Sequence, residues 1–237
     1  MTAALLREYS GLSPQGKVEF DSCHQHRFEN DRRDEEGRLM VILRSNGYTM
    51  EDATGRSKVA LYPKASLINH SCQPNVLNGD ASGTRKIIAM RDIFPGEEIS
   101  TTYIPLLMDT PNRQARLRQY GFACTCDACR ASGLSDHLRI QAGNNLSELQ
   151  QALTAPIMMK DSGLLLHRAE DLESFFAAQG FGDYLVKTTR LALQYAIRVR
   201  NSTAARTWAR KHLENLSIID AESTEAESTR EIVMNGI

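Results

Sequence analysis

The feature that most constrains the fold is a group of three cysteines, Cys124, Cys126 and Cys129, which lie within six residues of one another. Three thiolates at this spacing are typical of a structural zinc site, which is completed by a fourth protein ligand. The surrounding segment, with Gly121 and Asp127, is polar and rich in turn residues. This context disfavours the alternative that the three are free cysteines buried in a core, where such cysteines are common. The sequence therefore predicts one structural zinc ion.

The residues alone leave the fourth ligand open. Cys72 and Cys23 each offer a thiol, and His70 offers an imidazole two residues before Cys72. Because a closed zinc site takes four ligands, only one of these three residues is needed.

Composition restricts the class of protein. The chain has 237 residues, of which 41% are hydrophobic and 24% charged, and its formal net charge is −1. This balance is typical of an ordinary globular protein of one or two domains, and it disfavours direct nucleic-acid binding. No apolar run is long enough to span a bilayer, and the apolar patch near the N-terminus is too short for a secretory signal. We therefore expect an intracellular protein, nuclear or cytoplasmic, without membrane binding, in which clustered cysteines favour metal over disulfides.

The pattern along the chain changes twice. Residues 1–45 are predicted to be helical and charged, with a helix starting at Ser13-Pro14, and short strands and turns follow from residue 61 to 103. Apolar residues at helical spacing return after residue 111. The predicted strands cover residues 85–90 and 98–103, and the predicted later helices cover 113–119, 146–153, 162–178, 184–200 and 204–216.

Three motifs then occur in a fixed order. The segments Leu61–Asn75, Ala89–Tyr103 and Tyr120–Cys129 resemble the second half of a SET domain and its post-SET zinc loop. The family is that of the S-adenosylmethionine-dependent protein-lysine methyltransferases. The sequence is most similar to the subgroup of SET-and-MYND-like proteins, including the SET proteins common in fungi, and Asn46-Gly47-Tyr48 matches the Asn-x-aromatic element of that subgroup.

The resemblance implies an α+β fold: a partial SET-type β fold with a helical insert, a zinc-bound post-SET loop and a C-terminal α-helical region. The expected segments are a helical insert at 1–60, the C-terminal half of the SET domain at 61–104, the zinc loop at 105–132, the helical region at 136–219 and a disordered tail at 220–237.

The resemblance also implies roles for individual residues. Cys72 becomes the fourth zinc ligand beside Cys124, Cys126 and Cys129. Tyr103 is the expected catalytic residue, because its hydroxyl would orient the substrate amine, which must lose a proton against an ordinary pKa of about 10.4. The expected residues around S-adenosyl-L-methionine are Asn46, Ser66, Asn69, His70, Tyr103 and Phe122, with Asn69 and His70 gripping it and Phe122 covering the adenine. The expected substrate is a lysine of a histone or non-histone protein, and the C-terminal helices are expected either to bind a protein partner or to cap the core.

Each role has a simpler alternative. Tyr103 alone would be a core residue, Asn69-His70 a turn, and Arg113 with Arg116 a solvated helix face. Only the order and spacing of the three motifs favour the functional interpretation over these alternatives.

One expected element is missing. No Gly-x-Gly precedes Gly47, and no paired CxxC of a MYND finger occurs. We therefore expect the front half of the SET domain to be absent and cofactor binding to be weak. Three hypotheses follow: a truncated methyltransferase, a catalytically impaired SET-derived protein-interaction module, or an unrelated zinc-binding adaptor, which the motif order disfavours.

Overall fold

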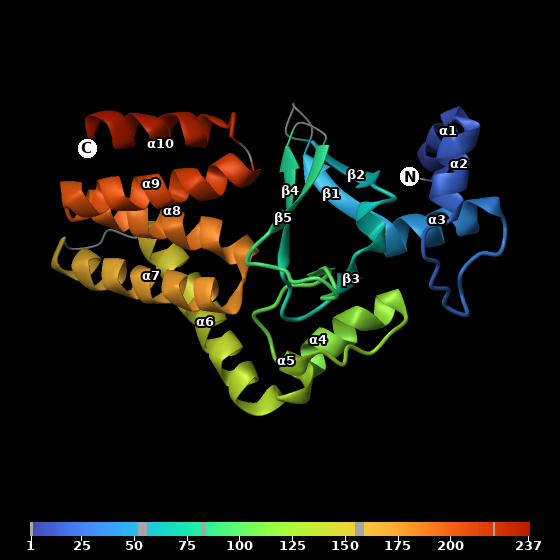
Figure 1. The fold of residues 1–237 in the computed structure, drawn as a ribbon, viewed down its shortest axis with the longest axis horizontal. Coiled ribbons are helices and arrows are strands. Elements are labelled where there is room, and N and C mark those ends of the chain that lie inside the picture. Colours follow the sequence, from blue (N-terminus) through green and yellow to red (C-terminus); the bar gives the residue numbers. More distant parts are fainter. Residues whose placement is uncertain (1, 52–55, 82–83, 155–158, 220) are drawn as a thin grey trace.

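The structure is a computed structural model that describes residues 2–51, 56–81, 84–154, 159–219 and 221–237. Short strands form its centre, three helices lie on one side of them, and a bundle of long helices lies on the other (Figure 1). The predicted α+β class is confirmed.

The N-terminal helices are α1 (Thr2–Gly11), α2 (Pro14–Asp21) and α3 (Glu35–Asn46). The predicted start at Ser13 is confirmed, because its side chain accepts a hydrogen bond from the Gly16 amide at 3.0 Å and Pro14 follows as the first helical residue. Asp34 caps α3 in the same way, through the Gly37 amide at 2.9 Å. Together these helices bury a small apolar cluster that contains Phe20, Cys23, Leu39 and Ile42.

Within the described residues, the strands form three separate two-stranded pairs. β1 (Gly47–Glu51) pairs antiparallel with β2 (Ser57–Leu61), β4 (Val76–Ala81) pairs antiparallel with β5 (Thr84–Ala89), and β3 (Asn69–His70) pairs parallel with β6 (Ser100–Thr101). The short helix η1 (Ala65–Leu67) precedes β3.

Two secondary-structure predictions need correction. The expectation of a helical segment over 1–60 is wrong at its end, because α3 stops at Asn46 and the aromatic and β-branched residues Tyr48, Thr49 and Val59 lie in the β1–β2 pair. The strand predicted over 98–103 is only two residues long. Beyond Thr101 its backbone leaves the ladder, since the amide of Tyr103 donates to the His70 side chain.

The zinc-loop region contains α4 (Thr110–Leu117), η2 (Arg118–Tyr120) and α5 (Asp127–Arg130). Asp109 caps α4 by accepting from the Asn112 amide at 2.9 Å. Gly121 then ends η2 with a φ of +83°, a left-handed conformation that favours glycine.

The C-terminal helices are α6 (Ser132–Thr154), α7 (Met159–Gln179), α8 (Gly182–Arg198) and α9 (Ser202–Ile219). The helices predicted from apolar spacing coincide closely with α7, α8 and α9, whereas α6 begins well before the predicted residue 146. Buried alanines, among them Ala192 and Ala196 on α8 and Ala205 and Ala209 on α9, lie in the main hydrophobic core. None of the helices in the described part of the chain has the length and apolar character to cross a bilayer.

The prediction of a disordered tail at 220–237 is wrong, since α10 (Thr224–Asn235) covers most of it. Ser223 caps this helix through the Ala226 amide, and Ala226 and Thr229 are buried. The charged composition of the tail gave no indication of this buried face of α10, which packs against α9 (Figure 1).

Candidate functional site

Four cysteines converge at the junction of the strands and the zinc loop. The sulfurs of Cys72, Cys124, Cys126 and Cys129 all lie within 4.8 Å of one another, and the Cys72 and Cys129 sulfurs are 3.6 Å apart. Four ligands at about 2.3 Å from a tetrahedral zinc ion would be separated by about 3.8 Å. The four cysteines therefore form a group that fits a metal ion, and Cys23 is not part of it.

The sulfurs are too close together to ionise independently. Contact with Cys126, together with burial, raises the pKa of the Cys72 thiol above its ordinary value, and the same contact lowers the pKa of Cys126. One thiol can thus become a thiolate at the expense of its neighbour. A bound divalent cation would remove this restriction, because metal-bound thiols are deprotonated.

His70 lies directly beside this group. Its Nδ1 accepts a hydrogen bond from the Tyr103 amide at 3.1 Å, so the neutral ring carries its proton on Nε2, which faces the Cys72 sulfur at 3.3 Å. Burial lowers the pKa of His70 to about 4, in agreement with a neutral ring. The side chain therefore orients a cysteine ligand, as residues behind metal ligands commonly do.

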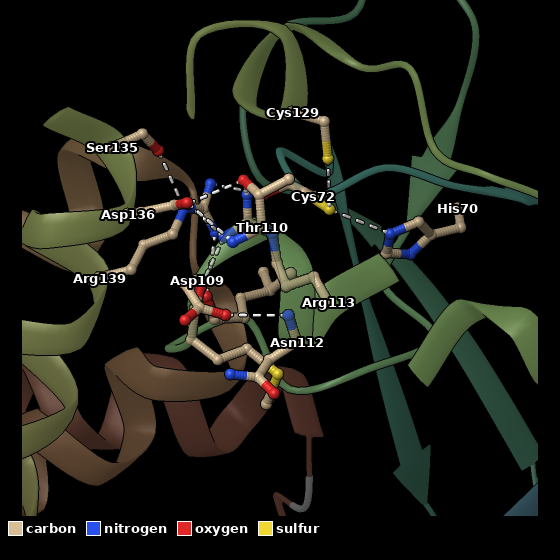
Figure 2. A network of polar contacts seen from close by, with 12 residues as sticks. His70, Cys72, Asp109, Thr110, Asn112, Arg113, Cys129, Ser135, Asp136 and Arg139 are labelled. Atoms are coloured by element: carbon tan, nitrogen blue, oxygen red, sulfur yellow. Dashed lines mark hydrogen bonds and ion pairs between the residues drawn. The ribbon is translucent and has the colours of Figure 1, made fainter. Parts of the chain in front are cut away.

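Two buried arginines lie behind the thiols (Figure 2). Arg113 is fully buried, forms an ion pair with Asp136 at 2.9 Å and interacts with the thiols of Cys129 and Cys72. Arg139 is 2% exposed and donates to the Cys72 carbonyl oxygen at 2.8 Å. The expectation of a solvated Arg113 is therefore wrong, whereas Arg116 is exposed as predicted. Helical periodicity identified the exposed face of α4, but α6 covers the opposite face through contacts that periodicity does not reveal.

The segment that carries Cys124 is held at two points, by α4 and by the N-terminal region. Gln114 binds the Cys124 backbone twice, by donating to its carbonyl oxygen at 2.7 Å and accepting from its amide at 3.0 Å. At Gly121 an added Cβ would lie 2.3 Å from Nδ1 of His26, and His24 contacts the Tyr120 carbonyl oxygen at 3.2 Å. The N-terminal region thus packs against the start of the loop. Sequence analysis assigned no role to either histidine.

The β3–β6 pair brings the two predicted motifs together. Asn69 lies opposite Ser100 and His70 opposite Thr101. The second asparagine of the motif, Asn75, is 2% exposed and holds the pair, because its Oδ1 accepts from the Ser100 amide at 2.8 Å and its Nδ2 donates to the Glu98 carbonyl oxygen at 2.9 Å. Asn75 is thus a structural residue that sequence analysis did not single out.

Two adjoining cavities share one wall. The larger cavity, about 640 Å³, is lined by Asn46, Ser66, Asn69, Tyr103, Tyr120 and Phe122 among others. The smaller cavity, about 340 Å³, is lined by Asn46, Tyr48, Ser66, Arg85, Tyr103 and Asp183 among others. Asn46, Ser66 and Tyr103 therefore border both cavities, and both volumes are within or close to the range of small-molecule sites.

Tyr103 stands between the two cavities. Its hydroxyl donates to the Ile68 carbonyl oxygen at 2.6 Å, and its ring lies 4.9 Å from that of Tyr120 and 6.4 Å from that of Phe122. Burial raises its pKa to about 12, so the phenol stays protonated at neutral pH. The hydroxyl is thus a fixed, neutral polar group on a residue that lines both cavities.

Five of the six residues expected around the cofactor line the larger cavity: Asn46, Ser66, Asn69, Tyr103 and Phe122. The expectation for the His70 side chain is wrong, because this ring is engaged by Cys72 and by the Tyr103 backbone. The Asn69 amide is exposed and donates to Glu98 at 2.7 Å. Tyr120 borders both cavities and was missed, since it precedes the glycine of a turn and gave no signal of its own.

Comparison with known proteins agrees with this arrangement. Residues 13–104 match the SET domain model, a span that includes Asn46, the β3–β6 pair and Tyr103. This segment of the chain is therefore similar to a SET domain.

Relatives whose names state an activity are similar to this chain over segments about as long as the SET-domain match. N-lysine methyltransferase SMYD2-B of Danio rerio is 41% identical over 98 residues, which are 40% of this chain and 23% of the relative. N-lysine methyltransferase SMYD2 of Homo sapiens and that of Bos taurus are each 40% identical over 93 residues, 38% of this chain and 22% of the relative. The matched region thus spans about a fifth of these relatives.

Proposed function

We propose that this chain is an S-adenosyl-L-methionine-dependent protein-lysine N-methyltransferase of the SET-and-MYND-like subgroup. The observation that carries the proposal is the position of Tyr103, a residue of the SET-matched segment that lines two adjoining cavities. A methyl donor on one side of this wall and an amine on the other would meet beside a single fixed phenol. The similarity to N-lysine methyltransferases supports a protein lysine as acceptor.

The larger cavity fits the cofactor. It offers the amide of Asn46, the hydroxyl of Ser66 and the aromatic rings of Tyr103 and Phe122, without an excess of basic groups. S-adenosyl-L-methionine would supply a methyl group on a cationic sulfonium, which favours carbonyl oxygens and aromatic faces. Asn46 is well placed to present its amide, since its Nδ2 is fixed by the carbonyl oxygens of His24 and Ile42, both at 2.7 Å.

The smaller cavity fits the lysine side chain. Its walls include the rings of Tyr48 and Tyr103, which suit an aliphatic stem, and the carboxylate of Asp183 from the first turn of α8. Arg85 stacks over Tyr48 with its guanidinium carbon 4.4 Å from the ring centre. An amine entering here would be stripped of water and aligned by the Tyr103 hydroxyl, and such positioning and desolvation supply most of the acceleration in a group transfer of this kind.

The four cysteines would hold one zinc ion with a structural role. Four thiolates leave no open position for water or substrate, so the ion would brace the loop that carries Tyr120 and Phe122. Phe122 is 37% exposed, and its ring lies 6.1 Å from that of His70, at the rim of the larger cavity. A bound metal would keep this ring at the rim of the larger cavity.

Transfer of a labelled methyl group from S-adenosyl-L-methionine to core histones and to a mixture of non-histone proteins tests the proposal. The wild type is expected to label lysine, and Tyr103→Phe is expected to lose at least about 100-fold in rate. Tyr9→Phe, whose hydroxyl contacts Asp21 on the remote N-terminal helices, is the matched control. Equal activity of the two variants would refute the role of Tyr103. A wild type that binds no cofactor would favour the SET-derived interaction module instead.

A further inference from the structure

Two buried arginine side chains lie behind the four cysteine thiols, and the geometry of the four-cysteine group does not itself require them. Arg113 is fully buried and Arg139 is 2% exposed. They come from different parts of the chain: Arg113 lies on α4 beside the zinc loop, and Arg139 lies on α6, the first helix of the C-terminal region (Figure 2). Buried guanidinium groups are costly unless an anion compensates them.

The charges of these two arginines are only partly balanced by carboxylates. Arg113 pairs with Asp136, and its Nε has no hydrogen-bond partner although it is buried. Arg139 forms no ion pair with a carboxylate of the described residues. It donates to the carbonyl oxygens of Cys72 and Leu106 and to the hydroxyl of Ser135, and its guanidinium lies 4.7 Å from the Phe181 ring centre. Among the described residues, the carboxylate of Asp136 is therefore the one that partly balances the charge of the two buried guanidinium groups.

The missing negative charge lies in the cysteine group. Arg113 interacts with the thiols of Cys129 and Cys72, and Arg139 interacts electrostatically with those of Cys72 and Cys126. A divalent zinc ion with four thiolates carries a net double negative charge. Asp136 neutralises one of the two guanidinium charges, so the pair of arginines contributes one net positive charge next to the double negative charge of the metal-bound thiolates.

We propose that Arg113 and Arg139 are the counter-charges of the four-thiolate metal site, so that metal retention depends on the docking of α6 against the zinc loop. Both are positioning residues that act through Cys72 and its neighbours. The inference rests on the zinc assignment made above but not on methyl transfer. It explains why Asp136 of α6 pairs with Arg113 of α4, and why Ser135 accepts a hydrogen bond from Arg139 within α6.

Zinc affinity of the 237-residue chain, measured by competition with a chromophoric chelator, tests this proposal. Arg139→Met is expected to weaken zinc binding by about 10- to 100-fold, as loss of a supporting residue behind metal ligands typically does. Arg139→Lys keeps the charge and is expected to stay within a few fold of the wild type. Arg116→Met, on the exposed face of α4, is the control. Cobalt substitution, read by its thiolate charge-transfer absorption, reports whether four sulfurs still bind.

A second measurement separates a charge role from a packing role. After chelation of the metal, Arg139→Met is expected to melt at the same temperature as the wild type or higher, because the buried cation then lacks most of the negative charge that four metal-bound thiolates supply. A packing role predicts equal destabilisation with and without metal, and that result would overturn the proposal, as would unchanged zinc affinity. If Arg139→Met fails to fold with zinc while Arg139→Lys folds, the charge role is supported; failure of both contradicts it. A wild type that binds no zinc would refute the zinc assignment itself.

Discussion

Asn75→Ala offers a quantitative test of how the site is assembled. The Asn75 side chain accepts from the Ser100 amide at 2.8 Å and donates to the Glu98 carbonyl oxygen at 2.9 Å and to the Glu97 carboxylate at 3.1 Å. The residue is 2% exposed, so an alanine would leave these partners without replacement. At about 0.5–1.5 kcal/mol for each hydrogen bond, the expected cost is roughly 2–4 kcal/mol in the local stability of the β3–β6 pair.

Asn69→Ala is the matched control from the same motif. Its side chain is exposed and makes a hydrogen bond to Glu98, so we expect a change of at most about 0.5 kcal/mol. Amide exchange followed by mass spectrometry over residues 68–72 and 98–103 measures the opening of the pair. Asn75→Ala should speed exchange there by roughly 30-fold or more, since about 1.4 kcal/mol corresponds to a factor of ten. Similar exchange in both variants would refute the assignment of Asn75 as the residue that holds the motifs together.

Three further outcomes are expected. Asp183→Asn should raise KM for the protein substrate several-fold and leave cofactor affinity unchanged; an effect on cofactor affinity alone would contradict the assignment of the smaller cavity. Cys124→Ser should reduce bound zinc from about one per chain to near zero while Cys23→Ser keeps it, as metal analysis would show. Burial lowers the pKa of His212, although its hydrogen bond to Glu225 opposes this, so the folded protein holds the ring neutral. The unfolded chain therefore binds the additional proton, and the melting temperature should fall from pH 7 to pH 5 more steeply in the wild type than in His212→Gln; equal slopes would contradict this.

The local signals in the sequence predicted the elements they act on. A capping serine before a proline identified the start of α2. The long C-terminal helices followed from apolar spacing. The cysteine spacing and the family resemblance together identified the four sulfurs that converge.

What the sequence did not reveal depends on contacts between distant segments. Arg113 looks like a surface residue until α6 covers it, and His70 looks like a cofactor ligand until the Tyr103 amide and the Cys72 sulfur engage its two nitrogens. The α10 helix was missed for the same reason, because its charged sequence favours disorder, whereas its small buried face and the ion pair between Glu225 and Arg190 hold it against the bundle. Each error concerned a packing partner from a distant segment of the chain, and the local sequence pattern does not indicate such partners.

Calorimetric titration with S-adenosyl-L-methionine, on zinc-loaded protein and on protein treated with a chelator, tests the central claim most directly. A single binding event in the zinc-loaded protein, weakened at least about tenfold when the metal is removed, is the predicted result, because the metal-closed loop carries Tyr120 and Phe122 over the larger cavity. Absence of binding to the zinc-loaded protein, or the same affinity with and without metal, would contradict it.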